Sequence, residues 1–326
     1  MQLITWVWHS CELELDPEIR TDQEDYLIKY FSGKLWNFQA TITHAPIRII
    51  SGKREIGGNY QKFNHYEGHS ILWAKVGQRI QMMIDNILSI EYDPNSWLSM
   101  VLSREDLQDA FIKAYIARTV RTYMDKMLIE SGFSFFHLWA IKMWDNVVLI
   151  SWNKWAGKTT TVITALEDFW AQYISNDRVW WKCSQDGLQI TEREGDTKIW
   201  EQTIQNSRIL SQHNTEKDDK TGKFHYPQVY TLFWDGERQV SWIAQHIFCP
   251  HVLDESKAAV KKILNPDDVL FNSFEDLWLW FSQYRVLFGE ISQSPLKPSY
   301  RVIKEWWESF GPKGIQEVLK VLSNSQ

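Results

Sequence analysis

The residues with the clearest capacity for chemistry lie in one short segment, SWNKWAGKTTT, at positions 151–161. It follows the apolar run VVLIS, typical of a buried strand, and leads into a stretch typical of a helix. Backbone N–H groups at a helix N-terminus bind anions. Gly157-Lys158-Thr159 therefore predicts a phosphate-binding loop, in which Lys158 reaches the β- and γ-phosphates of ATP and the Thr159 hydroxyl is a ligand of Mg²⁺. The alternative is an ordinary helix N-terminus.

The loop departs from the usual pattern Gly-x-x-x-x-Gly-Lys-[Ser/Thr]. Its first position is Trp152, and a second tryptophan, Trp155, lies inside it. Glycine serves in such loops because the backbone must adopt conformations that a Cβ forbids and must approach the phosphates closely. As written, the loop is therefore expected to bind nucleotide poorly. The predicted cofactor-binding residues are Trp152, Asn153, Lys154, Trp155, Ala156, Gly157, Lys158, Thr159 and Thr160.

Two neighbouring segments supply candidate catalytic residues. Asp177 follows a predicted strand in ISNDRV (174–179); we expect it to act as the general base for a substrate hydroxyl or as a ligand of Mg²⁺, the alternative being a strand-end cap. Arg178 is expected to stabilise phosphate charge during transfer, or else to form a surface salt bridge. His137 lies on the strand predicted for 133–143; the alternative for this residue is a hydrogen-bonded core histidine.

Together, FFH (135–137), VVLIS, the AGKTTT loop and ISNDRV resemble the kinase domain of HPr kinase/phosphorylase and related kinases. In that family a histidine precedes the first loop position by 15 residues, as His137 precedes Trp152. The family's aspartate pair falls on Asn176 and Asp177, followed by Arg178, so only the second position keeps a carboxylate. The resemblance covers 133–182 and continues more weakly through KIWEQTI (198–204) and IFCPHV (247–252), where relatives have similar strand motifs.

The resemblance implies an α/β fold with a P-loop-containing kinase core of the HPr kinase/PEP carboxykinase type. It also implies ATP and Mg²⁺ as cofactors and a serine hydroxyl of a protein or peptide as phosphate acceptor. A small-molecule hydroxyl acceptor stays open. Two alternatives remain: a catalytically inactive nucleotide-binding module with a degenerate loop, which Asn176 favours, and a carboxykinase-type lyase, for which the extra Lys and His metal ligands are not identifiable.

Three glycines of the family fall on tryptophans in this chain: Trp152, Trp155 and Trp170. The chain contains 19 Trp and only 15 Gly, an unusual balance. One hypothesis explains both observations: the gene uses UGA for glycine, and the sequence was translated with UGA as tryptophan. The rival explanations are a degenerate pseudokinase and an engineered loop.

Two histidine clusters elsewhere carry weaker signals. His246, Cys249 and His251 lie close in sequence, but strand alternation sends the first two to opposite faces and Pro250 is expected to break the segment, so a metal site is not predicted. His65 and His69 have the spacing of a zincin pair, but the β context argues against a helix that carries both.

The elements that position these residues divide the chain into two predicted domains, 1–128 and 129–326. The first is an α+β region with strands at 41–50, 69–76, 79–84 and 87–92, a short helix at 16–31, and a long helix at 103–128 that opens with a capping box from Ser103 to Asp106. The second alternates strands (133–143, 147–151, 171–175) with helices (159–169, 273–288, and around 301–323). We expect NTEKDDKTGK (214–223) to be a polar loop.

Composition excludes several classes of protein. The chain has 326 residues, 44% hydrophobic and 23% charged, so extensive disorder is not expected. The net charge of −6 disfavours a nucleic-acid binder, and three scattered cysteines indicate a reducing compartment. No signal peptide or membrane span is predicted, so we expect a cytoplasmic protein without a nucleic-acid or membrane partner; a homo-oligomer is left open.

Overall fold

The computed structural model describes residues 2–4, 9–18, 42–52, 61–64, 70–94, 97–103, 106, 110–130, 133–151, 156–175, 179–191, 197–213, 215, 217, 222–226, 232–233, 241–251, 260–262 and 305–324. Contacts divide the chain into two compact units, the first running from Met1 to Gly132 and the second beginning at Phe133. The predicted helices at 16–31 and 273–288 fall outside the described residues, apart from 16–18, which form a turn.

The first unit is built on an eight-stranded sheet in the order β1-β2-β3-β8-β7-β6-β5-β4. The central strands β2, β3 and β8 run parallel, and the remaining neighbours pair antiparallel. The strands are β1 (Gln2–Ile4), β2 (His9–Leu15), β3 (Ile42–Ser51), β4 (Gln61–Asn64), β5 (Ser70–Val76), β6 (Arg79–Ile84), β7 (Leu88–Asp93) and β8 (Trp97–Leu102). The strands predicted at 41–50, 69–76, 79–84 and 87–92 are therefore confirmed to within a residue or two.

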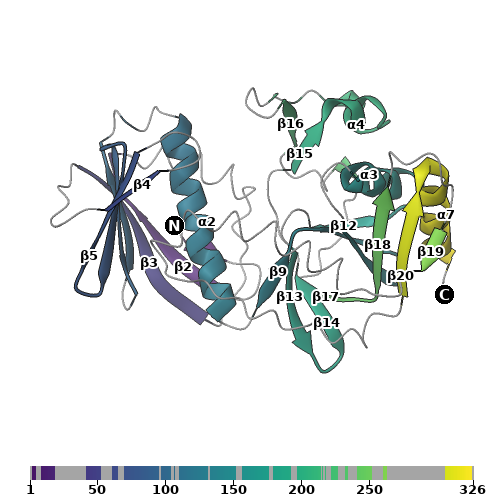
Figure 1. The fold of residues 1–326 in the computed structure, drawn as a ribbon, viewed down its shortest axis with the longest axis horizontal. Coiled ribbons are helices and arrows are strands. Elements are labelled where there is room, and N and C mark those ends of the chain that lie inside the picture. The colour runs from purple at the N-terminus through teal and green to yellow at the C-terminus, as the bar shows by residue number, and fades with distance from the viewer. Residues whose placement is uncertain are drawn as a thin grey trace. The chain divides into compact units, whose positions relative to one another are not determined.

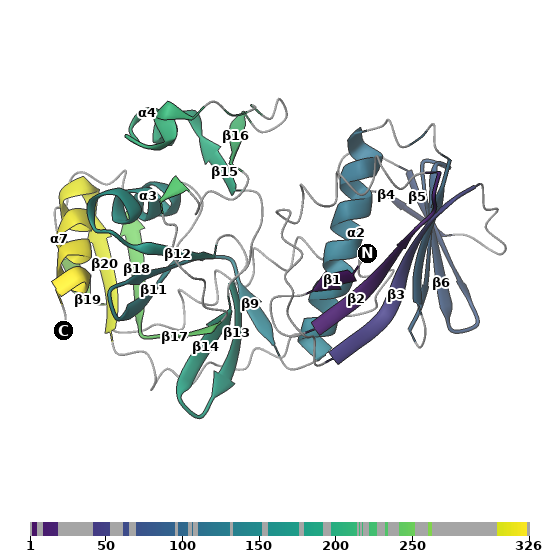
Figure 2. The same ribbon diagram turned by 180° about the vertical axis from the view of Figure 1, so that it is seen from behind.

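A long helix, α2 (Ala110–Glu130), covers one face of this sheet (Figures 1 and 2). Tyr123 of α2 packs edge-on against Tyr92 of β7, with ring centroids 6.0 Å apart. One half of the predicted capping box is present ahead of the helix: Ser103 Oγ accepts from the Asp106 N–H at 3.4 Å, while the Ser103 hydroxyl donates to Asp106 Oδ2 at 2.6 Å.

The second unit has three layers, with a six-stranded sheet in the middle. The order is β12-β10-β11-β18-β20-β19, in which β11, β18 and β20 run parallel. The strands are β10 (Trp139–Met143), β11 (Asn146–Ile150), β12 (Gln172–Ser175), β18 (His246–His251), β19 (Val260–Lys262) and β20 (Glu305–Phe310).

Because side chains alternate between the two faces of the middle sheet, its strands contribute to two separate hydrophobic cores. Trp139, Ile141 and Met143 of β10 face α3 (Lys158–Asp168) and α7 (Gly311–Asn324), whereas Ala140 of the same strand faces a second sheet. That sheet has four strands in the order β17-β14-β13-β9: β9 (Ser134–Phe136), β13 (Val179–Ser184), β14 (Gly187–Thr191) and β17 (Ser241–Ala244). The result is a mixed α/β unit with helices on one face of the middle sheet and strands on the other.

A smaller element packs with the helical layer. It consists of the hairpin β15 (Thr197–Trp200) and β16 (Lys223–Tyr226), the short helix α4 (Glu201–Gln205) and the 3₁₀ turn η2 (Leu210–Gln212). Ile199, Leu210 and Tyr226 anchor it in the same core as α3. Below, residues 197–226 are called the clamp segment, and the statements about it concern its described residues.

Four predictions about this unit were wrong in detail. The single strand predicted for 133–143 is two strands in different sheets, because the chain bends at His137 and Leu138. KIWEQTI (198–204) is a strand followed by a helix, and the predicted helix around 301–323 begins as a strand, β20, that pairs with β18. Pro250 does not break β18, because the ladder to β11 has already ended at Phe248.

Candidate phosphate-binding site

The candidate site begins where β11 ends. All five residues of β11 are buried between β10 and β18, as expected for an apolar strand inside a sheet covered on both faces. The Ser151 N–H extends the ladder by donating to the Phe248 carbonyl at 3.0 Å. The chain resumes at Ala156 and enters α3 at Lys158, whereas Trp152, Asn153, Lys154 and Trp155 lie outside the described residues. The predicted order of strand, loop and helix is thus present.

Gly157 sets the geometry at the entrance to α3. It is the N-cap residue and has φ 94° and ψ 18°, in the left-handed region that glycine tolerates far better than other residues. Its carbonyl accepts the first helical hydrogen bond, from the Thr161 N–H at 2.8 Å. Since glycine has no side chain, no side-chain acceptor caps the helix. N–H groups of an uncapped first turn favour an anion at this position.

Three side chains on the first turn of α3 could take part in binding. Lys158, Thr159 and Thr160 are all partly exposed. Thr160 Oγ1 lies 3.4 Å from Thr203 Oγ1 of α4, so this hydroxyl faces the clamp segment. The two threonine hydroxyls therefore differ. That of Thr160 contacts another part of the protein, whereas that of Thr159 is the one predicted from the sequence to bind Mg²⁺.

Strand pairing connects the described residues on either side of His137 with β11, β12 and β13. Trp139 pairs with Ile150, the last residue before the loop, and Ala140 pairs with Ser175 of β12. Val179 pairs with Phe136 across the second sheet. The segment 176–178 is therefore flanked by described residues whose partners lie on either side of His137.

His137 lies in the bend between β9 and β10 and is only 8% exposed. It is therefore not on a strand, contrary to the prediction, but its neighbours keep it at the edge where β11 ends. Asn176, Asp177 and Arg178 lie outside the described residues.

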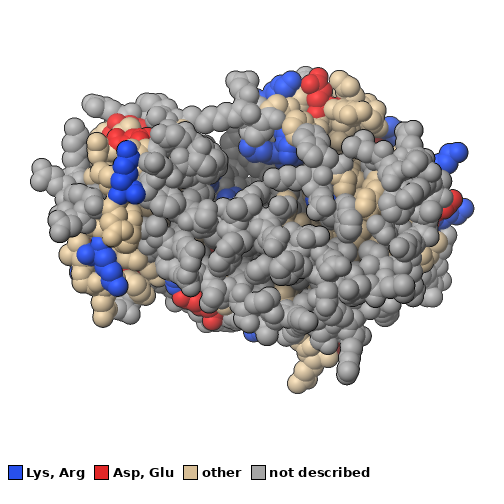
Figure 3. All heavy atoms as spheres, viewed as in Figure 1, with Lys and Arg blue, Asp and Glu red and all other residues tan. Residues whose placement is uncertain are grey.

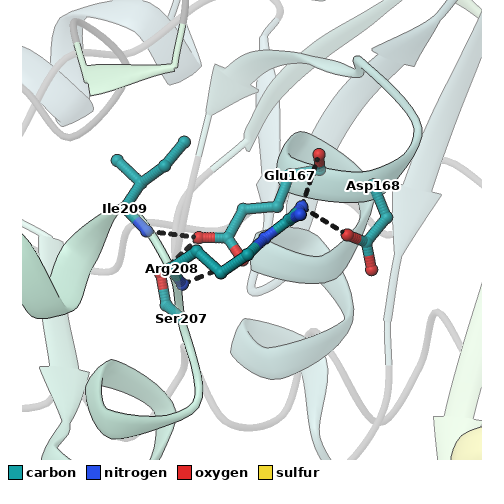
Figure 4. Close-up of polar contacts among 5 residues, drawn as sticks. All are labelled: Glu167, Asp168, Ser207, Arg208 and Ile209. Atoms are coloured by element: carbon teal, nitrogen blue, oxygen red, sulfur yellow. Dashed lines mark hydrogen bonds and ion pairs between the residues drawn. The ribbon is translucent and has the colours of Figure 1, made fainter.

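The clamp segment is held at the far end of α3 mainly by the Glu167 carboxylate, with Asp168 as a second partner (Figure 4). Glu167 Oε1 accepts hydrogen bonds from Ser207 Oγ at 2.5 Å and from the Ile209 N–H at 2.9 Å, and Oε2 accepts from the Arg208 N–H at 3.3 Å. Arg208 in turn donates to the Glu167 carbonyl and pairs with Asp168 Oδ1 at 2.7 Å. Contacts at both ends of α3 therefore hold the clamp segment along this helix.

The clamp segment carries charged and aromatic side chains that contact one another. Lys223 Nζ lies 5.0 Å from the centre of the Trp200 ring, and Lys217 Nζ lies 3.3 Å from Glu201 Oε2. Figure 3 shows blue and red side chains over this part of the second unit. Inside it, Tyr226 donates to the Leu210 carbonyl at 3.2 Å, and burial raises the pKa of its phenol.

The sequence did not identify Thr203 as a neighbour of the first turn of α3, or Glu167 as the residue that holds the clamp segment at the other end of this helix. Both depend on contacts between α3 and a segment about forty positions further along the chain, as Thr160 to Thr203 illustrates.

The histidine cluster at 246–251 has a structural role in this unit. His246 Nε2 lies 3.0 Å from Asn146 Oδ1, and Asn146 Nδ2 donates to the Leu322 carbonyl at 3.1 Å, which ties β11, β18 and α7 together. Cys249 is buried in the core between the two sheets. Within the described ranges, no three His, Cys, Asp or Glu side chains lie close enough together to bind a metal ion. Among the described helices, none is long and apolar enough to cross a membrane. His65 and His69 lie outside those ranges.

Comparison with known proteins adds little. Neither a protein-family model nor a curated protein matches the chain. Among solved structures, the chain is similar to the HPr(Ser) kinase/phosphatase from Coxiella burnetii, with 14% identity over 40% of this chain and 78% of that chain and a TM-score of 0.25. A similarity of this strength does not assign the chain to a family.

Proposed function

We propose that the chain is an ATP-dependent phosphotransferase that transfers the γ-phosphate to a hydroxyl group. One observation supports this most directly. Gly157, in a left-handed conformation, ends the connection from β11 to α3, so that Lys158 and Thr159 lie on the uncapped first turn of this helix. In sheets with parallel strands, ligands bind at the carboxyl ends of those strands, where this turn lies.

Each residue of the site has a defined role in this proposal. The first-turn N–H groups and Lys158 hold the phosphates, and Thr159 with Asp177 holds Mg²⁺, which would neutralise charge on the phosphates. Asp177 also orients or deprotonates the acceptor hydroxyl, Arg178 stabilises the phosphate charge during transfer, and His137 is the third catalytic residue. Phosphoryl transfer mainly requires positioning and charge neutralisation, and these residue types supply both.

The acceptor in this proposal is a serine of a protein or peptide, as the motif resemblance implies, with a small-molecule hydroxyl as the alternative. The proposal includes neither a nucleic-acid nor a membrane partner and places the protein in the cytoplasm. The oligomeric state is left to measurement.

A second candidate function is nucleotide sensing without turnover. Asn176 favours it, because the strand-end motif keeps only one of the two carboxylates expected for a kinase of this kind. Binding of Mg-ATP is common to both functions, whereas phosphate transfer distinguishes them.

The test is a titration of Mg-ATP against the chain as written and against the double variant Trp152→Gly/Trp155→Gly, monitored by thermal unfolding. Ligand at 100 times its dissociation constant stabilises a protein by about 2.7 kcal/mol, which is readily measured. We expect stabilisation of the double variant, loss of that stabilisation on adding Lys158→Ala, and retention on adding Lys313→Ala.

Lys313 is a matched control because it is an exposed lysine in the first turn of another helix, α7. Transfer of label from γ-labelled ATP to serine peptides then separates the two functions. Absence of stabilisation in both the written chain and the double variant contradicts nucleotide binding altogether.

A further inference from the structure

Two tryptophans of the second unit have a backbone conformation that suits glycine. Trp144 has φ 56° and Trp170 has φ 57°. Bulky residues are rarely found in this region, because the Cβ crowds the backbone. The other non-glycine residues with positive φ in the described part of the chain are Asp85 and Asn86, which are the types that tolerate it.

The same two indoles are also the most exposed of the large hydrophobic side chains that the structure describes. Trp144 is 64% exposed and Trp170 is 86% exposed, whereas Ile50, Val76 and Val321 range from 39% to 46%. Such exposure means that packing does little to offset the unfavourable backbone conformation of either residue.

Trp144 can be compared directly with a glycine in this chain. It is the first of two loop residues in the β10–β11 hairpin, between the paired residues Met143 and Asn146. Gly77 has the same place in the β5–β6 hairpin, between Val76 and Arg79, with φ 65°. In both loops only the first residue has positive φ, a pattern for which two-residue hairpins use glycine.

Trp170 occupies the position at which helices commonly end in glycine. It follows Phe169, the C-cap of α3, and the N–H groups of Phe169 and Ala171 both donate to the Ala165 carbonyl at 3.1 Å. A left-handed residue directly after a C-cap is usually glycine, because the reversal satisfies the last helical carbonyls without a Cβ penalty.

Other tryptophans of this unit are ordinary core residues. Trp139 is 3% exposed and packs edge-on against Tyr173, and Trp242 is 8% exposed with Lys142 Nζ 5.1 Å from its ring centre. Both lie in strands, and neither has positive φ. These four described tryptophans thus fall into two physical classes: two exposed with positive φ, and two buried within strands.

We propose that Trp144 and Trp170 are glycine in the native protein, because UGA codons at these positions are read as glycine, and that the same holds for Trp152 and Trp155. The assignment of 144 and 170 follows from backbone conformation and exposure alone. Its extension to 152 and 155 rests on the proposed function. With glycine at 152, the loop matches Gly-x-x-x-x-Gly-Lys-Thr in full, and glycine at 155 removes the second indole from inside it.

Two readouts test the assignment without any measurement of activity. We expect UGA codons at 144, 152, 155 and 170 and UGG codons at 139 and 242 in the gene. Peptides from the protein purified from its source cells should carry glycine at the first four positions and tryptophan at the other two. A UGG codon, or a tryptophan mass, at 144 or 170 overturns the proposal. Tryptophan at 152 or 155 alone overturns only its extension to the loop.

Thermal unfolding of the chain as written provides an independent test. Trp144→Gly and Trp170→Gly should each raise the midpoint of unfolding, because glycine relieves the left-handed conformation and little packing is lost. Trp139→Gly and Trp242→Gly are matched controls and should lower it. If the first two variants lower the midpoint as the controls do, the assignment is wrong, whatever the outcome of the Mg-ATP titration.

Discussion

Trp139, the first residue of β10, is the antiparallel partner of Ile150, the last residue of β11. This pairing places the bend that carries His137 at the same end of the middle sheet as the loop into α3. Strand pairing therefore brings His137, in the bend before β10, to the end of the sheet at which Lys158 and Thr159 begin α3.

His137→Asn tests whether this position serves catalysis. In the Trp152→Gly/Trp155→Gly background we expect Mg-ATP still to stabilise the protein, while transfer to serine peptides falls by about 10²–10⁴-fold, the range for loss of a general acid or base. His246→Asn is the control, because His246 contacts Asn146 away from the loop. A parallel loss of stability and binding in His137→Asn indicates a structural histidine instead.

The Thr160–Thr203 contact predicts a measurable coupling between α3 and the clamp segment. Their hydroxyl oxygens are 3.4 Å apart, longer than a typical O–H···O hydrogen bond, so the coupling should be modest. A double-mutant cycle with Thr160→Val and Thr203→Val should give about 0.5–1 kcal/mol in the free energy of unfolding. Strict additivity of the two single variants contradicts the contact.

Glu167→Gln should loosen the other end of the clamp segment. The carboxylate accepts bonds from Ser207, Arg208 and Ile209, and hydrogen bonds to a charged group contribute about 1.5–3 kcal/mol. We expect a loss of stability of roughly 2 kcal/mol and faster amide exchange at 207–210. Asp168→Asn is the control: its pair with Arg208 is exposed and should contribute about 0–1 kcal/mol. Equal effects of the two variants contradict an anchoring role for Glu167.

The raised pKa of Tyr226 should make the stability of the fold depend on pH in the alkaline range. Burial raises its pKa above the ordinary value of 10.0, so the folded protein favours the protonated phenol. This contribution to stability is complete below pH 10.0 and is lost as pH rises through the raised pKa of the folded state. Tyr226→Phe should cost about 1 kcal/mol near neutral pH through the lost bond to Leu210. The difference from the parent should shrink above pH 10.0, and a constant difference up to strongly alkaline pH contradicts the raised pKa.

Ser103→Ala tests the capping box ahead of α2. The Ser103 hydroxyl bonds both the side chain and the N–H of Asp106, and loss of an N-cap of this type costs about 1 kcal/mol. Hydrogen exchange at the Asp106 amide should become faster, while exchange in α3 of the second unit stays unchanged. Ser211→Ala, at an exposed serine in η2, serves as the control.

Local pattern was enough to predict three neighbouring strands of the first unit, β5, β6 and β7, and the order of β11, loop and α3. Ser70–Val76 and Arg79–Ile84 carry strand-forming residues, and a two-residue break separates them, so both strands are encoded within a short window. The run VVLIS followed by Gly157-Lys158-Thr159 is likewise a local signal.

Features that depend on distant partners could not be predicted in the same way. The switch of sheets at His137 is set by Val179 and Ile150, which pair with residues on either side of the bend. Glu305–Phe310 is a strand because β18 and β19 both pair with it, not because of its own pattern. The role of Glu167 depends on the clamp segment, which packs against α3 only in the folded unit.

The position of β20 in the middle sheet has a consequence for synthesis of the chain. It lies between β18 and β19, yet it comes from residues 305–310 and is synthesised after both of its neighbours. Until then β18 presents an open backbone edge, the kind of surface that invites pairing with other chains. Nascent chains that stall before this strand is made therefore keep this edge open, and the middle sheet of the second unit is completed only after translation has passed residue 310.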